Sequence, residues 1–384
     1  MTQTIDQTAE AVPGSAGTNS AEAAAASQPA DGSSRSRFYP LTVKSVDHLT
    51  EDSAAVTFDV PAEYAELFDF AAGQSLTLRR VIDGAEHRRT YSICAPAGAD
   101  PRIGVREVPE GLFSLWLVNE VRPGDVIEVQ PPSGSFRADP DQGGRHLCIA
   151  AGSGITPMLS IASTVLSNPD ASVTLLYGNR KTNTVMFAEE LADLKDARNQ
   201  QLDLVHVLSR EPREVELFSG RLDEDKLRQL LSAIVPIGSM DHVWLCGPFG
   251  MLNDARKVLA EFDVPKEAIH FELFYVDEPP PEVVHADKVV EGATSDVTVV
   301  LDGRRTTSAM SQGKTILDSA QESRSDLPFA CKGGVCGTCR AKICGGEVNM
   351  VRNYALEDAE VEANFVLTCQ TFPVSDEVTV DFDS

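Results

Sequence analysis

Hydrophobic positions recur at every second residue over much of the first third of the chain. This alternation predicts strands over residues 41–46, 55–60, 74–79 and 126–130, with a helix over 111–121 before the last of them. Turn residues separate these runs. Short strands joined by turns favour a closed antiparallel barrel.

The pattern changes between residues 141 and 278, where apolar runs alternate with amphipathic segments. The runs predict strands over 147–151, 172–177, 202–208, 241–246 and 269–272, with helices between them. Repeated strand–helix units build parallel sheets, so this part is expected to be a doubly wound α/β domain. Such sheets bind ligands beyond the carboxyl ends of their strands.

A third pattern begins near residue 295. It comprises a strand over 297–301, an Asp302-Gly303 hairpin turn, a strand over 304–309, a helix over 315–324 and a closing strand over 378–382. This order predicts an α+β domain of the β-grasp type. The expected fold class is therefore multi-domain: an antiparallel β-barrel (37–140), an α/β doubly wound parallel-sheet domain (141–278) and an α+β domain (295–384).

Two further segments have the composition of unfolded chain. Residues 1–36 are rich in Ala, Ser, Gly, Gln and Thr, contain no aromatic residue and have Arg35 as their only arginine. They lack the basic start and apolar core of a signal or transit peptide, so a disordered tail is expected. Prolines and acidic residues predict an extended linker over 279–294.

Charge and cysteine content narrow the possible functions. The formal net charge of −25 at pH 7 argues against binding to nucleic acid or to an anionic membrane and favours docking to a basic protein surface. No apolar run reaches the roughly 18 residues of a membrane-spanning helix. Of the eight cysteines, several are scattered singly, which suits a reducing cytoplasm better than a disulfide framework.

The remaining cysteines form a spaced motif. Cys331, Cys336 and Cys339 follow a C-x4-C-x2-C pattern, and with Cys369 they match the ligand spacing of a plant-type [2Fe–2S] cluster. A zinc knuckle on Cys336 and Cys339, or inert buried thiols, are the alternatives, but zinc sites usually show a second short-spaced ligand pair. Cys344 is either a bystander or a competing ligand.

Glycines in the motif fit the cluster interpretation. Gly333, Gly334 and Gly337 lie between the thiols, where a loop around a cluster needs positive φ angles and a close backbone approach. Their amides are expected to point at sulfur.

A second motif lies on a predicted barrel strand. The sequence Arg89-Thr90-Tyr91-Ser92 resembles the flavin-binding R-x-Y-S signature of the ferredoxin–NADP reductase superfamily. The resemblance implies that Arg89 binds the FAD pyrophosphate, that Tyr91 flanks the flavin and that Ser92 lies near its N5 atom. An ordinary strand with an exposed arginine is the alternative. The same resemblance assigns further cofactor-binding residues, namely Thr90, Val105, Arg106, Gly111 and Ser114.

A glycine-rich turn follows the first strand of the α/β domain. Gly152, Ser153, Gly154, Thr156 and Pro157 resemble the nicotinamide-nucleotide loop of the same superfamily, in which a pyrophosphate contacts backbone amides. Pro157 suits the first turn of the following helix. Tight strand-to-helix packing alone is the other explanation of the glycines.

Two more strand ends bear on the identity of the nucleotide. Ser209-Arg210 resembles the Ser-Arg pair that holds the 2′-phosphate in NADP-dependent relatives, and Arg180 ends the neighbouring strand. An acidic residue would instead bind the ribose 2′-hydroxyl, so NADPH is favoured over NADH. Otherwise both arginines are ordinary surface residues.

The turn Cys246-Gly247-Pro248 resembles the C-G-P turn of the family, whose cysteine lies beside the nicotinamide ring. Cys246 is otherwise a small buried hydrophobe. Glu272 and Phe274 align more loosely with an acidic–aromatic pair of relatives. On this resemblance Ser92, Cys246 and Glu272 are the candidate catalytic residues.

The order of flavin barrel, nucleotide domain and ferredoxin resembles the reductase components of multicomponent oxygenases over residues 38–384. Residues 353–358 and 367–376 resemble the family of reductase subunits of phenylacetyl-CoA epoxidases, which act in phenylacetate catabolism. The implied activity is electron transfer from NADPH through FAD and a [2Fe–2S] cluster to a di-iron oxygenase. Exposed acids of the ferredoxin unit, Glu357, Asp358 and Glu360, either steer that docking or form a solvated helix face.

Two other functions remain open at this stage. One is the reductase of a ring-hydroxylating or steroid-hydroxylating oxygenase. The other, from a different class, is a redox-sensing iron–sulfur module with a vestigial flavin site, against which the three intact nucleotide and flavin motifs argue.

Overall fold

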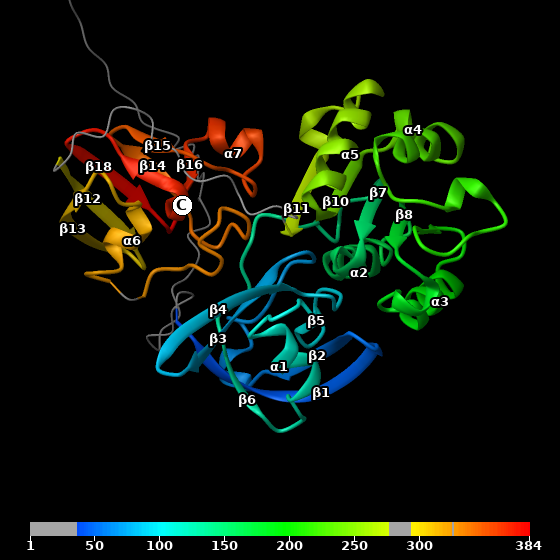
Figure 1. Ribbon diagram of the computed structural model, residues 1–384, viewed down its shortest axis with the longest axis horizontal. Helices are drawn as coiled ribbons and strands as arrows, with labels where there is room; N and C mark the ends of the chain where they lie inside the picture. Colours follow the sequence, from blue (N-terminus) through cyan, green and yellow to red (C-terminus); the bar gives the residue numbers. More distant parts are fainter. Residues whose placement is uncertain (1–36, 276–292, 325) are drawn as a thin grey trace, which may run out of the picture. The chain divides into compact units, whose positions relative to one another are not determined.

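The computed structural model describes residues 37–275, 293–324 and 326–384. The tail expected over 1–36 and nearly all of the linker expected over 279–294 lie outside these residues. The described chain contains three large sheets that carry the predicted fold classes, together with a two-stranded sheet of β15 (Val348–Met350) and β17 (Thr371–Pro373) (Figure 1).

The first sheet is an antiparallel barrel of six strands in the order β4-β3-β6-β1-β2-β5. Ile93, directly after β4, bridges to Ile103 of β5, which brings the two outer strands together. Along β1 the side chains of Tyr39, Leu41 and Val43 are buried while those between them are exposed, as the alternation predicts. The elements are β1 (Tyr39–Thr50), β2 (Ser53–Asp59), β3 (Ser75–Ile82), β4 (Ala85–Ser92), β5 (Arg102–Arg106), α1 (Ser114–Asn119) and β6 (Val126–Val129).

The second sheet is parallel, with the strand order β11-β10-β7-β8-β9. The order reverses beside β7, so the turn after β7 lies at the switch point where doubly wound sheets bind nucleotides. The elements are β7 (Gly144–Ala151), α2 (Ile155–Val165), β8 (Ala171–Asn179), α3 (Ala188–Ala197), β9 (Leu202–Leu208), α4 (Glu224–Ala233), β10 (His242–Pro248), α5 (Phe249–Glu261) and β11 (Ile269–Tyr275).

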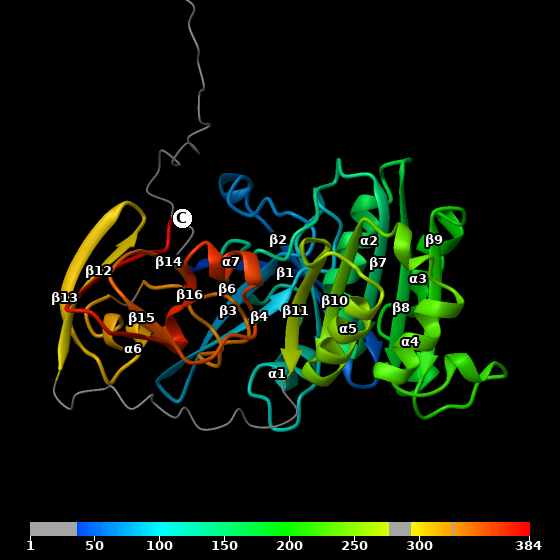
Figure 2. The same ribbon diagram turned by 90° about the horizontal axis from the view of Figure 1, so that it is seen from above.

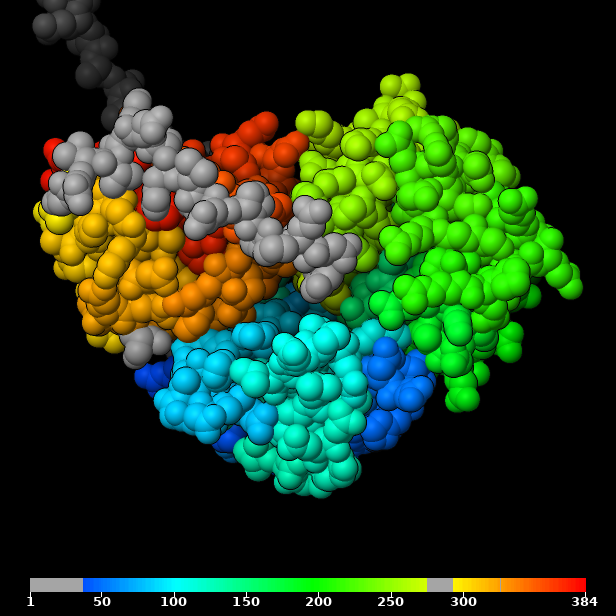
Figure 3. All heavy atoms as spheres, in the orientation of Figure 1, coloured from blue at the N-terminus to red at the C-terminus, as the bar shows by residue number. Residues whose placement is uncertain are grey.

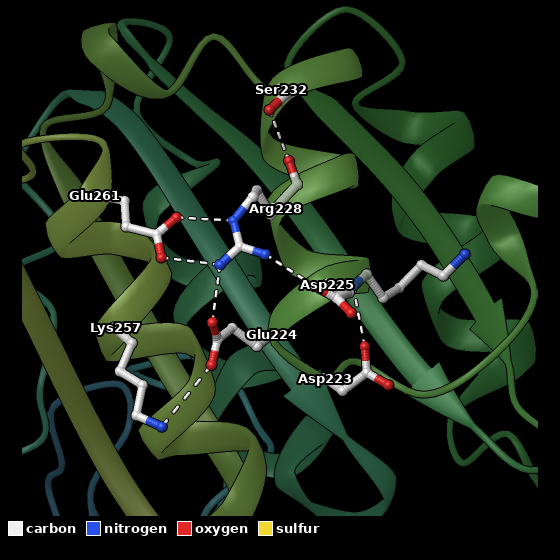
Figure 4. A network of polar contacts seen from close by, with 8 residues as sticks. Asp223, Glu224, Asp225, Arg228, Ser232, Lys257 and Glu261 are labelled. Carbon is white, nitrogen blue, oxygen red and sulfur yellow. Dashed lines mark hydrogen bonds and ion pairs between the residues drawn. The ribbon is translucent and has the colours of Figure 1, made fainter.

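Helices cover both faces of this sheet. Residues of α2 and α3 share one hydrophobic core with the sheet, and residues of α4 and α5 share the other (Figure 1). Arg228 of α4 joins the second pair, because its guanidinium donates to Glu224 and Asp225 on its own helix and to both carboxylate oxygens of Glu261 on α5, at 2.8–2.9 Å (Figure 4). Asp223 caps α4 by accepting a hydrogen bond from the amide of Lys226 at 3.0 Å.

The third sheet has the strand order β13-β12-β18-β14-β16 and packs on α6 to form the β-grasp domain. β12 and β13 form a long hairpin (Figure 2), and Asp302 and Gly303 at its tip have positive φ angles of 52° and 68°, as the predicted turn requires. The elements are β12 (Thr294–Leu301), β13 (Arg304–Ser311), α6 (Ile316–Ala320), β14 (Arg340–Gly345), β15 (Val348–Met350), α7 (Asp358–Glu362), β16 (Phe365–Leu367), β17 (Thr371–Pro373) and β18 (Glu377–Asp381).

Several element boundaries differ from the sequence-based expectation. The helix expected over 111–121 is α1, which begins only at Ser114 because residues 107–113 form a turn. The helix expected over 315–324 is α6, which Thr315 caps and which ends at Ala320. In the space-filling view, the residues of each domain lie together as one block of related colours (Figure 3). Among the described residues, none of the helices is long and apolar enough to cross a membrane.

Candidate functional site

The flavin-type motif occupies the end of β4. Arg89 is exposed, and its guanidinium donates to the carbonyl of Arg88 at 2.7 Å. Tyr91 packs against the barrel core, and burial raises the pKa of its phenol. Ser92 is buried at the last position of the strand. The motif therefore offers one exposed cation, an aromatic face and a hydroxyl along a single strand.

The turn before α1 is closed by Ser114. Its hydroxyl accepts a hydrogen bond from the amide of Val108 at 3.0 Å. A Cβ atom at Gly111 would lie 2.5 Å from the Ser114 Oγ and 2.9 Å from the Val108 carbonyl, so only glycine fits at this close approach. Val105, by contrast, has its side chain in the barrel core, which leaves only its backbone for a ligand.

A hydrogen-bonded carboxyl joins the barrel to the nucleotide domain. Ser92 donates to one oxygen of Glu272 at 2.8 Å, and Ser75 of β3 donates to the other at 3.2 Å. Burial raises the pKa of Glu272 to about 7, against the two hydroxyl hydrogen bonds that lower it. Glu272, which aligns only loosely with the acidic residue of relatives, is therefore in direct hydrogen-bond contact with Ser92. Ser75 was not predicted, although its cross-strand pairing with Ser92 is the signal that identifies it.

Cys246 lies beside this carboxyl. The register of β10 and β11 pairs Cys246 with Glu272, and Cys246 is fully buried, which raises the pKa of its thiol well above the ordinary value. A neutral buried thiol is a poor nucleophile. Ser92, Cys246 and Glu272, the three candidate catalytic residues, are therefore brought together. The adjoining Phe274 packs against the core formed with α2 and α3.

The glycine-rich turn contacts the Cys246 turn directly. A Cβ atom at Gly154 would lie 2.2 Å from the carbonyl oxygen of Cys246, and Gly152 has a positive φ of 56°. Thr156 donates to the Ser153 carbonyl at 3.0 Å. At Gly247 an added Cβ would lie 2.7 Å from the Cε of Met251, at the flexible end of that side chain.

A proline lies in the first turn of α2, and another lies directly before α5. Pro157 is the third residue of α2, within the first turn, where a missing amide proton costs no helical hydrogen bond. Pro248 precedes α5 in an extended conformation. Both helices therefore start with backbone amides that have no partner within the helix.

Arg106 reaches from the barrel to the nucleotide loop. Its guanidinium donates to the Thr184 carbonyl at 2.5 Å and lies 3.4 Å from Asp52. One Nη atom is 3.4 Å from the position that a Cβ at Gly152 would take, and Tyr177 donates to the Gly152 carbonyl at 3.0 Å. This cation lies at the turn expected to bind a pyrophosphate.

The two arginines of the expected 2′-phosphate site lie side by side. The amide of Arg210 donates to the carbonyl of Arg180 at 2.8 Å, and both side chains are exposed. Within the described ranges neither forms an ion pair with an acidic residue. Glu211 follows directly, but its carboxylate accepts from the amide and hydroxyl of Thr182 at 2.9 and 2.7 Å, which lowers the pKa of Glu211. Ser209 is the remaining residue of the expected 2′-phosphate site, and its amide donates a hydrogen bond to the carbonyl of Asn179 at 2.9 Å.

The four motif cysteines fall into two pairs. Contact with Cys336 lowers the pKa of Cys331, and contact with Cys339 lowers that of Cys369. The remaining member of each pair, Cys336 and Cys339, has a raised pKa. Among the described residues, no group of three or more His, Cys, Asp or Glu side chains is arranged to hold a single metal ion. A [2Fe–2S] cluster needs a different donor set, with two thiols for each of its two irons.

The loop around these thiols directs amides at sulfur. The amides of Gly333 and Cys336 approach the Cys331 Sγ at 3.3 and 3.4 Å. Gly334 and Gly337 have the expected positive φ angles, of 79° and 66°, but Gly333 does not, and Lys332 has one instead, at 52°. Cys344 lies outside the loop on β14, exposed, with its thiol 3.9 Å from the Lys342 carbonyl.

The acidic residues expected to steer a partner are engaged within the chain. Glu357 lies 3.3 Å from His270, Asp358 lies 3.0 Å from Lys266, and Glu360 lies 2.7 Å from Arg340. The side chain of Asp358 nevertheless stays 55% exposed, so the steering role of these acids stays a prediction.

Three family models match this chain in order. The oxidoreductase FAD-binding domain matches residues 40–138, the oxidoreductase NAD-binding domain 148–257, and the 2Fe-2S iron-sulfur cluster binding domain 299–374.

Curated relatives share this layout over most of their length. The chain is 40% identical over 352 residues to a 1,2-phenylacetyl-CoA epoxidase subunit of Escherichia coli (strain K12), covering 90% of this chain and 98% of that protein. It is 32% identical over 360 residues to the ferredoxin reductase component of 3-ketosteroid-9-alpha-monooxygenase from Rhodococcus rhodochrous, covering 90% and 97%. Phthalate dioxygenase reductase has the same fold, with a TM-score of 0.56 at 24% identity over 90% of this chain and 98% of that one.

Fold and site together define an electron-transfer oxidoreductase with flavin, nicotinamide-nucleotide and iron–sulfur domains. The chain belongs to the family of oxygenase reductase components that includes this subunit of 1,2-phenylacetyl-CoA epoxidase.

Proposed function

We propose that this protein takes electrons from NADPH and delivers them to the oxygenase component of a phenylacetyl-CoA epoxidase. The observation that carries this proposal is the 40% identity to the epoxidase subunit of Escherichia coli along 98% of its length. A ketosteroid mono-oxygenase is the second candidate partner, supported by the 32% identity to its reductase component. The eight cysteines are all free, which supports a reducing, cytoplasmic location.

When bound, FAD would supply the conversion between two-electron and one-electron chemistry, and a [2Fe–2S] cluster would supply one-electron transfer. On the barrel side, the exposed guanidinium of Arg89 and the amides of the Gly111–Ser114 turn hold the FAD pyrophosphate. Tyr91 presents its ring to the flavin, and the backbone of Thr90 and Val105 lines the site.

The nucleotide side orients the coenzyme. The Gly152–Gly154 turn and Arg106 bind its pyrophosphate, while the Cys246 turn limits where the nicotinamide can lie. The carboxyl of Glu272, whose pKa is raised to about 7, holds the Ser92 hydroxyl in place and retains a proton below that pH. The four sulfurs of Cys331, Cys336, Cys339 and Cys369 hold the cluster.

The charge beside the adenosine site supports the proposed preference for NADPH. Arg180 and Arg210 are exposed cations, and Thr182 already binds the adjacent carboxylate of Glu211, which would otherwise favour a ribose 2′-hydroxyl. We expect Arg210→Ala to lower kcat/KM for NADPH by about tenfold, a loss of roughly 1.4 kcal/mol, and to leave NADH nearly unchanged. Equal efficiency of NADPH and NADH in the unaltered protein would contradict the assignment.

The partner is tested by reconstitution. The purified reductase is mixed with the oxygenase components of a phenylacetyl-CoA epoxidase or of a ketosteroid mono-oxygenase, and product formation from NADPH is measured. The proposal expects turnover with the epoxidase components at a rate well above that with the steroid enzyme. The reverse ranking would identify the steroid oxygenase as the partner.

A further inference from the structure

Arg88 is an arginine that the barrel buries although no part of the flavin motif requires it. Its side chain is only 4% exposed. The guanidinium donates to Glu86 at 2.8 Å and to the carbonyl of Leu327 at 3.1 Å. It lies 4.9 Å from the ring centroid of Phe38 and 4.0 Å from that of Phe329.

Two of these partners belong to the iron–sulfur domain. Burial lowers the pKa of Arg88, with Glu86 opposing the effect, but a guanidinium stays charged in proteins. A buried cation is costly unless acceptors surround it. Leu327 supplies the carbonyl that accepts from the Arg88 guanidinium, and Phe329 supplies one of the two aromatic rings that contact it. The barrel alone therefore does not provide all of the partners of this buried cation.

The same face of β4 makes a second contact further along. Side chains alternate along a strand, so Arg88 and Thr90 share one face while Arg89 lies on the other. The Thr90 hydroxyl lies 3.2 Å from that of Thr338. Thr338 directly precedes Cys339.

The two contacts hold opposite ends of the cluster loop. Leu327 and Phe329 lead into Cys331, where the loop begins, and Thr338 lies near its end. Both ends therefore rest on the strand that carries the flavin motif.

We propose that Arg88 is a positioning residue that docks the cluster loop on β4, the strand that also carries the flavin motif. The proposal rests on the proposed flavin role of Arg89 and Tyr91 and on the four cluster ligands. Arg88 touches neither cofactor in it. It sets the separation of the centres by binding Leu327 and Phe329.

The test compares Arg88→Met, Arg88→Lys and Arg122→Met in the purified holoenzyme. Methionine keeps an unbranched apolar stem and removes the charge and donors, and lysine restores a charge over the Phe329 ring without the fork. Arg122 is the control, because among the described residues its guanidinium donates to carbonyls of the barrel alone, those of Val121 and Asn119 at 2.8 Å.

Two readouts are taken. Anaerobic rapid mixing with NADPH measures flavin bleaching and cluster bleaching separately, and hydrogen–deuterium exchange of the oxidised protein follows the amides of residues 327–339. For Arg88→Met we expect cluster bleaching to slow by about tenfold, the loss of one charged hydrogen bond and one cation–π contact. Flavin bleaching should stay within twofold, exchange should rise, and Arg88→Lys should be intermediate.

Unchanged cluster bleaching together with unchanged exchange in Arg88→Met would overturn the proposal, as would an equal change in Arg122→Met. Should Arg88→Met fail to fold or to retain FAD, Phe329→Leu removes the facing ring from the other domain. It is expected to slow cluster bleaching about threefold, and no change there would also overturn the proposal. If NADPH bleaches neither centre in the unaltered protein, the proposed function fails, and the exchange of residues 327–339 alone decides the role of Arg88.

Discussion

Gly154 is a position at which adding one methyl group should disrupt the nucleotide site. A Cβ atom there would lie 2.2 Å from the carbonyl oxygen and 2.6 Å from the carbonyl carbon of Cys246. Both are backbone atoms at the end of β10, so no rotation of a side chain relieves the overlap. The φ angle of Gly154 is −61°, which alanine adopts freely, so the effect of Gly154→Ala is purely steric.

The overlap forces the glycine turn and the Cys246 turn apart by about 1 Å, at a cost of about 1–3 kcal/mol in the free energy of unfolding. A displacement of that size between groups that align a hydride donor and acceptor is expected to slow flavin reduction by about 10- to 100-fold. FAD content should be unchanged, because the barrel residues are not displaced.

The assay is anaerobic rapid mixing with NADPH, followed by flavin bleaching, alongside the thermal midpoint. Gly238→Ala is the matched control, since a Cβ there meets no atom within 4 Å and its φ is not positive. A flavin reduction rate and thermal midpoint of Gly154→Ala equal to those of Gly238→Ala would refute the steric argument.

Three further outcomes are expected. Burial raises the pKa of Glu272 from 4.5 to about 7, so stability falls as pH rises through this interval, by at most about 3 kcal/mol. Glu272→Gln should flatten the fall in thermal midpoint between pH 5 and 8, and an unaltered fall would show that another group causes it. Cys369→Ser should abolish the visible and EPR signals of the cluster while Cys344→Ser preserves them; equal loss would make Cys344 a ligand. Leu317→Ala, at a fully buried position of the third domain, should cost about 2–5 kcal/mol and lower the cluster content measured by iron analysis, whereas full retention of iron would show that this core can collapse around the cavity.

The pattern of hydrophobic residues and turns was sufficient to predict the three fold classes: alternation for the barrel, apolar runs between amphipathic segments for the α/β domain, and the order of strands and helix for the third domain. Tyr39, Leu41 and Val43 follow it along β1, because a half-buried strand must place every second side chain inward. Helix ends were less predictable, since capping by Thr315 and the turn before Ser114 depend on local hydrogen bonds that composition does not reveal.

The site was predictable where a residue type has one chemical use and unpredictable where the use depends on tertiary contacts. Thiol spacing identifies Cys331 and its partners in advance. Nothing in the sequence distinguishes Arg88 from an ordinary surface arginine, because its burial depends on residues about 240 positions away, at Leu327. The positive φ of Lys332 was likewise unexpected at a residue with a side chain.

The hydrogen bonds from Ser75 and Ser92 to Glu272 also bear on the construction of chimeric reductases. A nucleotide domain transplanted from another protein would carry its own terminal strand onto this barrel. Without an acceptor at position 272, two serine hydroxyls would be left unsatisfied at the seam. With a carboxyl group but no serines, the graft would bury that group without its two hydrogen-bond donors, which would raise its pKa further. Recombination between such proteins should therefore succeed most often when these three positions are inherited together.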